Sequence, residues 1–211
     1  MIIIPLGYNC ETAKFLRKNN LRKISYPFDW LITMSLNTIN KILEDKNFDK
    51  NFLNNIKNYG KDNKLYLKYF GAGKDIDNIM FISNNYPGLI FRHFDFLNNI
   101  EDYKTLNRRI IRFKEQLFKK EKIIFIRIIH DGNVNNRLLK SKINYNKLDD
   151  ININNLNNDI NNFFNILDKQ YNRKNDKLLI VVENINYFNK VKNININNVY
   201  FIDKLSCNII T

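Results

Sequence analysis

Runs of apolar residues alternate with helical patterns along the second half of the chain. Residues 122–129, 178–182 and 199–202 are almost continuously apolar over strand length, and residues 151–171 form an Asn-rich amphipathic helical pattern. Such strands, separated by helices, are typical of a parallel sheet covered on both faces. The pattern predicts an α/β fold with a mostly parallel central sheet and helices on both faces.

The first half predicts shorter elements: a short strand at the start of residues 2–13, strands at 64–69, 79–83 and 89–93, and helices at 10–17, 36–43, 48–56 and 103–117. The turn signal at residues 86–88 predicts that the last two of these strands form a hairpin. The chain has only three prolines and six glycines and no Ser/Gly-rich linker. We therefore expect one domain over residues 1–211, in which the polar segment 135–158 is a surface loop.

The composition is that of a globular protein, because 44% of the 211 residues are hydrophobic and 13% are aromatic. The two cysteines are separated by almost the whole chain, which argues against a disulfide framework and a structural zinc site. The start of the chain lacks a basic leader, and no apolar run approaches the roughly 20 residues that span a bilayer. These features predict a protein of the cytoplasm without a membrane partner.

Asparagine, isoleucine and lysine dominate the chain, which contains 40 Asn. Their codons are rich in A and T, so the composition indicates an AT-rich genome, such as that of a parasite, a symbiont or a large DNA virus. For a viral protein the compartment is the host cytoplasm. The formal net charge of +13 favours loose attraction to phosphate polymers, but the basic residues are scattered. The charge therefore predicts only weak polyanion binding.

Cys10 stands where the first strand leads through a turn into a helix. Gly7 allows the tight turn, and Asn9 is a good N-cap for that helix. The first N–H groups of the helix lack intrahelical partners, so they stabilise a thiolate and can hold an oxyanion together with the Asn9 side chain. The residues predict a nucleophilic Cys10; the alternative is a small buried hydrophobe at a strand-to-helix junction.

His93 and His130 are the two histidines of the chain, and so the candidates for a base beside Cys10. Alternation along the predicted strand puts His93 and Asp95 on one face, where Asp95 can orient the imidazole. The alternative is a half-buried histidine bonded to a backbone carbonyl. His130 follows the strand at 122–129 and is the alternative base, because sites gather at the strand ends of parallel sheets.

Asp29 and Arg127 are charged residues in apolar surroundings. Asp29 lies between Phe28 and Trp30, and it predicts either a contact with substrate or a salt bridge to an arginine of the helix at 103–117, namely Arg108, Arg109 or Arg112. Arg127 lies inside an apolar strand, where a buried guanidinium demands an acidic partner or a bound anion. The predicted substrate-binding or oxyanion-binding residues are Gly7, Asn9, Asp29, Trp30 and Arg127.

Five short motifs occur in an order and spacing that resembles a known family: LGYNCETA at 6–13, PFDWL at 27–31, HFDF at 93–96, RRIIRF at 108–113 and IFIR at 124–127. This is the papain-like cysteine peptidase family of bacteria and large DNA viruses. The resemblance covers residues 2–185 and implies Cys10 as nucleophile and His93 as base, with a papain-like α+β fold as the alternative architecture. The family's histidine is directly followed by Asp and Phe, whereas here Phe94 intervenes before Asp95.

These features predict a thiol-dependent hydrolase or acyltransferase, in which His93 deprotonates Cys10 and the thiolate attacks an amide or ester carbonyl. Peptidase, deamidase, deubiquitinase-like and transglutaminase-like reactions use the same parts, on a protein or another acyl or amide substrate. No cofactor or metal is expected. One alternative is a Rossmann-like module that binds phosphate, a sugar nucleotide or a polyanion, with Arg127 reading the charge. Another is a catalytically inactive protein that binds a partner through exposed aromatic side chains.

Overall fold

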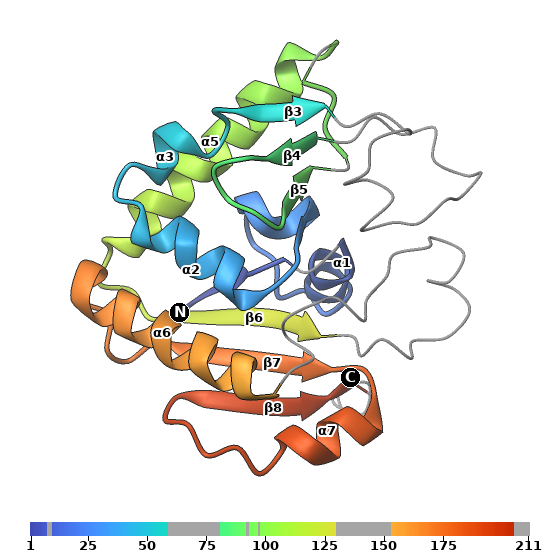
Figure 1. Ribbon diagram of the computed structural model, residues 1–211, viewed down its shortest axis with the longest axis vertical. Helices are drawn as coiled ribbons and strands as arrows, with labels where there is room; N and C mark the ends of the chain where they lie inside the picture. Colours follow the sequence, from blue (N-terminus) through green and yellow to red (C-terminus); the bar gives the residue numbers. More distant parts are fainter. Residues whose placement is uncertain (8–9, 59–80, 92, 97, 130–152, 205–211) are drawn as a thin grey trace.

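Two sheets and the helices around them make up the part of the chain that the structure describes (Figure 1). The computed structural model describes residues 1–7, 10–58, 81–91, 93–96, 98–129 and 153–204. The strand predicted at 64–69 and most of the loop predicted at 135–158 lie outside these ranges. Residues 153–158 belong to a helix, because α6 spans Ile153–Tyr171.

The larger sheet is parallel throughout, as the apolar runs predicted. Its strands lie in the order β1 (Ile2–Pro5), β6 (Ile123–Ile129), β7 (Lys177–Val182) and β8 (Val199–Asp203). The register pairs Ile2 with Ile123, Ile124 with Lys177 and Leu178 with Val199. The prediction of an α/β fold with a mostly parallel sheet is therefore confirmed.

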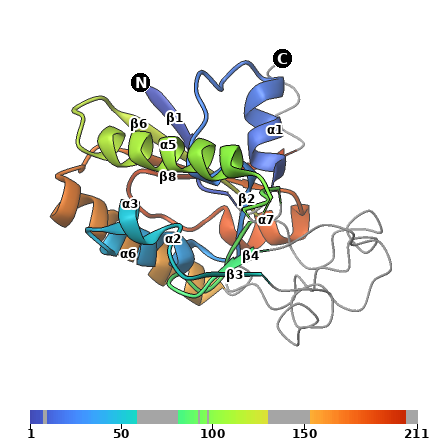
Figure 2. The ribbon, with the colours of Figure 1, turned by 90° about the horizontal axis from the view of Figure 1, so that it is seen from above.

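Helices cover both faces of the parallel sheet, with α1 (Cys10–Lys18) and α6 on opposite sides (Figure 2). On one face, Leu16 of α1 packs against Ile126 and Ile128. On the other face, the ring of Phe163 from α6 meets the ring of Phe125 edge to face at 5.1 Å. Strands buried on both faces read as nearly continuous apolar runs, which explains the pattern of β6 and β7.

A second, antiparallel sheet joins four three-residue strands in the order β2 (Leu31–Thr33), β5 (Leu89–Phe91), β4 (Phe81–Ser83) and β3 (Ile56–Asn58). The predicted hairpin is confirmed as β4 and β5, which pair Ile82 with Ile90. The helix predicted at 48–56 is wrong in its second half. Helix α3 spans only Phe48–Asn51, and the chain then turns at Asn55, whose φ is +57°, into β3.

The remaining helices complete the core between the sheets. Helix α5 (Ile100–Leu117) confirms the helix predicted from the apolar spacing, and α2 (Leu36–Glu44) begins at the Ser35 cap. Phe113 of α5 packs edge to face on Phe28, with ring centroids 5.2 Å apart. Helix α7 (Ile185–Val191) packs against β7 and β8. In the part of the chain that the structure describes, no helix has the length and apolar character needed to cross a membrane.

Candidate active site

Cys10 is the first residue of α1, at the carboxyl edge of the parallel sheet where β1 ends. The turn before it depends on Gly7, whose φ is +78°, and on Thr12, whose Oγ1 donates a hydrogen bond of 2.7 Å to the Gly7 carbonyl. The Cys10 side chain is half-buried and its thiol is free. Asn9 lies outside the described residues, so its predicted roles as cap and oxyanion donor stay predictions.

His93 and the helix that begins with Cys10 both lie against the same short segment. This segment is the 3-10 helix η1 (Pro27–Trp30), which packs on α1. The exposed His93 ring meets the ring of Trp30 edge to face, with centroids 5.9 Å apart. Trp30 therefore stands at the junction of the two segments.

Asp95 does not share a strand with His93, because β5 ends at Phe91. The alternation argument for Asp95 is therefore wrong. The Asp95 carboxylate accepts hydrogen bonds from the Asn98 amide at 3.2 Å and from Asn98 Nδ2 at 2.9 Å, and the Asp95 amide donates to Asp102 Oδ2 at 2.8 Å. These bonds shape the turn that leads into α5. His130 lies outside the described residues, so its role as alternative base stays a prediction.

Asp29 is fully buried, and its ion pair is with Arg22 rather than with an arginine of α5. Burial raises the pKa of the Asp29 carboxyl, and the Arg22 guanidinium opposes that rise through its charge and its hydrogen bond. Among the α5 arginines, Arg109 acts on Asp29 only through its charge, and Arg112 instead donates to the Ser25 carbonyl at 2.8 Å. The salt bridge predicted to α5 is therefore corrected to Arg22.

Trp30 has a cation on one side as well as the imidazole. The Arg22 guanidinium lies 5.9 Å from the centroid of the Trp30 ring, within the range of a cation–π interaction. Because Asp29 holds Arg22 by an ion pair, the indole, the guanidinium and the carboxylate form one connected group. This group fixes the position of the Trp30 ring, against which the His93 ring lies.

Arg127 is fully buried and holds the two sheets together. Its Nη1 donates to the Leu6 carbonyl at 3.2 Å and to Thr33 Oγ1 at 2.8 Å, and its Nη2 donates to the Thr33 carbonyl at 3.0 Å. Thr33 Oγ1 also donates to the Leu6 carbonyl at 2.9 Å. The guanidinium thus joins β6, β2 and the residue before Gly7, which supports a structural role close to the site.

Sequence reasoning missed Thr33, Thr12 and Arg22. Thr33 lies in a three-residue strand without a recognisable pattern, and Arg22 lies between elements, so neither carried a signal of its own. The Thr12 bond to Gly7 is a local side-chain interaction that the spacing within LGYNCETA permits. Among the residues that the structure describes, no group of three or more His, Cys, Asp or Glu side chains is placed to hold a metal ion.

A family model described as "Putative papain-like cysteine peptidase" matches residues 1–147. The chain belongs to this family. The family match includes Cys10, Trp30, His93 and Arg127, and it ends before α6, β7 and β8. No curated protein and no solved structure shows significant similarity to the chain. Membership confirms the resemblance carried by the five motifs, all of which lie within residues 1–147, and supports thiol hydrolase chemistry. The extension of the resemblance from residue 148 to residue 185 stays a prediction.

Proposed function

We propose that the chain is a thiol-dependent hydrolase in which Cys10 is the nucleophile and His93 is the general base. The observation that carries the proposal is the position of Cys10 as the first residue of α1, in a chain that belongs to a cysteine peptidase family. At this position a thiolate meets the free N–H groups and the positive end of the helix.

The reaction begins when His93 takes the Cys10 proton and the thiolate attacks the carbonyl carbon of an amide or ester. The carbonyl π electrons move to oxygen, and the amides of the first turn of α1 stabilise that oxyanion, assisted by the Asn9 side chain. His93 then gives its proton to the leaving amine or alcohol as the tetrahedral intermediate collapses to a thioester. Water activated by His93 cleaves the thioester and restores the thiol.

Transfer of the acyl group to an acceptor other than water uses the same steps, so acyltransferase activity is part of the proposal. Trp30 acts as a positioning residue, because its ring contacts the His93 ring and belongs to a segment that packs on α1. The Arg22 and Asp29 pair keeps Trp30 in place. A peptide or another amide in the cytoplasm is the proposed substrate.

The competing proposal of a phosphate-binding module is less well supported. It requires Arg127 to bind a negatively charged ligand. Arg127 is fully buried, however, and donates hydrogen bonds to the Leu6 and Thr33 carbonyls and to the Thr33 hydroxyl. A guanidinium engaged in this way has fewer donors left for an anion.

Alkylation of Cys10 by iodoacetamide tests the proposed pair in the Cys207→Ser background, in which Cys10 is the sole cysteine. We expect Cys10 to react faster at neutral pH than a free cysteine peptide, and His93→Ala to remove that excess. Hydrolysis of an activated ester should fall about 100-fold or more in His93→Ala, the range typical of a lost general base.

His130→Ala is the matched control, because it removes the other histidine. It should leave both rates unchanged if His93 is the base. Equal alkylation rates in wild type and His93→Ala would overturn the assignment of His93. If only His130→Ala lowers the rates of alkylation and hydrolysis, His130 is the base. If Cys10 is alkylated no faster than the free cysteine peptide, the assignment of Cys10 as nucleophile is wrong.

A further inference from the structure

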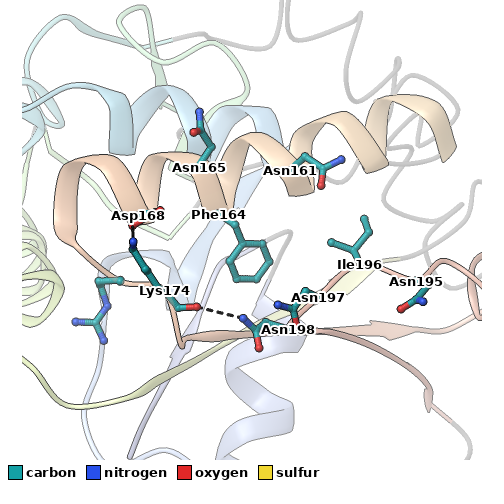
Figure 3. A pocket seen from close by; sticks show the side chains of 10 residues that line it. Asn161, Phe164, Asn165, Asp168, Lys174, Asn195, Ile196, Asn197 and Asn198 are labelled. Carbon is teal, nitrogen blue, oxygen red and sulfur yellow. Dashed lines mark hydrogen bonds and ion pairs between the residues drawn. The ribbon is translucent and has the colours of Figure 1, made fainter.

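Two adjoining hollows lie at the amino edge of the parallel sheet, the edge opposite the one where α1 begins. The first, which we call the lysine hollow, measures about 310 Å³ and is lined by Phe118, Lys119, Lys120, Lys122 and Tyr171, among others. The second, the asparagine hollow, measures about 590 Å³ and lies between α6 and the segment before β8 (Figure 3). Arg173 and Lys174 line both, so the two hollows form one track.

The lysine hollow carries positive charge that nearby acids do not neutralise. Within the described chain, Lys119, Lys120 and Lys122 form no ion pair, and all three are exposed. The acids around the track are already engaged: Asp176 with Arg173, Glu121 with the Met1 ammonium at 2.9 Å, and Asp168 with Lys174 at 3.7 Å. A ligand of the lysines must therefore bring its own negative charge.

Arg173 holds the backbone of this lysine-bearing loop in one shape. Its buried guanidinium donates to the carbonyls of Leu117, at 3.2 Å, and Glu121, at 2.6 Å, and to that of Lys119. It also pairs with the buried Asp176 carboxylate. The loop between α5 and β6 is thus tied to the start of β7 by one side chain. A rigid loop displays its lysines at low entropic cost on binding.

Aromatic side chains accompany the charge. Phe118 is 63% exposed, and its ring meets the ring of Tyr171 edge to face at 5.3 Å, which leaves a face of Phe118 open to solvent. In the asparagine hollow, Phe164 points from α6 toward the segment before β8, where Asn197 lies, and Asn161 lines the same space from α6 (Figure 3). Carboxamides donate and accept hydrogen bonds, as base edges and ribose hydroxyls require.

From these observations we infer that the track along the amino edge binds single-stranded nucleic acid. The lysines contact phosphates, Phe118 stacks on a base, and the asparagine hollow receives a neighbouring nucleotide. A single strand fits better than a duplex, because a duplex hides the faces of its bases from an aromatic side chain. A purely acidic protein partner would leave the exposed Phe118 ring without a flat group to stack on. This binding site is separate from the proposed thiol chemistry and does not depend on it.

Fluorescence anisotropy of a labelled oligouridylate of about ten nucleotides, with the full chain over a series of salt concentrations, tests the inference. The triple variant Lys119→Gln, Lys120→Gln, Lys122→Gln should weaken binding and reduce the slope of log K against log salt by about 2, since each phosphate contact to a single strand contributes about 0.7. Phe118→Ala should weaken binding about tenfold through lost stacking.

Matched controls separate the track from bulk charge. Lys18→Gln, Lys23→Gln, Lys57→Gln removes the same charge from exposed lysines outside the hollows and should leave the slope unchanged. Asn197→Asp should weaken binding, whereas Asn189→Asp, exposed on α7, should not.

Equal losses in the two lysine triples would overturn the inference, because binding would then depend on net charge alone. The inference would also be overturned if Phe118→Ala bound the oligouridylate with undiminished affinity and had an unchanged melting temperature. Equal competition by polyglutamate would assign the track to an acidic protein instead, and tighter binding of double-stranded RNA would exclude the single-strand mode.

Discussion

Replacing Gly7 with alanine is expected to destabilise the turn that leads into Cys10. Gly7 has a φ of +78°, and a Cβ there would lie 2.7 Å from Thr33 Oγ1 and 3.1 Å from Thr33 Cγ2. An alanine in the left-handed region costs roughly 1–2 kcal/mol. Thr33 must also shift, which weakens its bonds to the Leu6 carbonyl and to Arg127, each contributing about 1 kcal/mol. We expect a total loss of roughly 3–4 kcal/mol in the free energy of unfolding.

Urea unfolding followed by the fluorescence of Trp30, the only tryptophan, measures this loss. Thr33→Ala removes both atoms that the new methyl group meets. In that background Gly7→Ala should cost only the backbone strain of about 1–2 kcal/mol. The double-mutant cycle should therefore give a coupling of about 2 kcal/mol between the two positions.

Gly88→Ala is the matched control, because Gly88 has a φ of +90° and its added Cβ would lie 2.6 Å from Thr38 Oγ1. It should lose comparable stability but leave the alkylation rate of Cys10 unchanged, since Gly88 belongs to the β4–β5 turn. Gly7→Ala should slow that alkylation in the folded protein. A coupling between Gly7 and Thr33 below about 0.5 kcal/mol would refute the steric argument.

Arg127→Met is expected to destabilise the protein by about 2–4 kcal/mol in urea unfolding, because the buried Thr33 carbonyl loses its charged donor; unchanged stability with lost hydrolysis would instead assign Arg127 to substrate. Asp45 is expected to make the free energy of unfolding depend on pH. Burial opposes ionisation of its carboxyl, but hydrogen bonds from Tyr86, at 2.6 Å, and from Asn51 and the Asn47 amide hold its pKa below the ordinary value of an aspartate. The stability that this depressed pKa contributes is complete above about pH 4 and is lost as the pH falls through the lower folded value. Asp45→Asn should therefore flatten the free energy of unfolding against pH below about pH 4, and coincident profiles for the two proteins would contradict this assignment.

The pattern of apolar and polar residues was sufficient to predict a helix or strand wherever the burial of that element dictates which residues it contains. The inner parallel strands β6 and β7 are almost continuously apolar because both of their faces are covered, and α5 shows apolar residues at helical spacing because one face packs on the core. Gly7 and the turn into α1 were likewise visible, since a positive φ favours glycine whatever the surroundings. The five motifs predicted the family, and the family match over residues 1–147 confirms it.

The second sheet was only partly visible in the sequence. Its strands have three residues each, too few to show an alternating pattern, and only the turn before Gly88 marked the hairpin. The helix predicted beyond Asn51 fails because β3 finds a hydrogen-bonded partner in β4, a contact between segments far apart in the chain. Pairing between distant strands overrides the weak local preference of residues 52–56 for a helix.

At the candidate site, the sequence by itself determined which residues are candidates for the chemistry, and the tertiary structure decided which of the described ones meet. The charge of Asp29 and the burial of Arg127 were evident from their apolar neighbours, but the choice of Arg22 over the α5 arginines, and of Thr33 and Leu6 as partners of Arg127, depends on how the sheets pack. The contact of Trp30 with His93 joins residues 63 positions apart. Such contacts have no local signal, because the free energy that selects them comes from burial shared by distant segments.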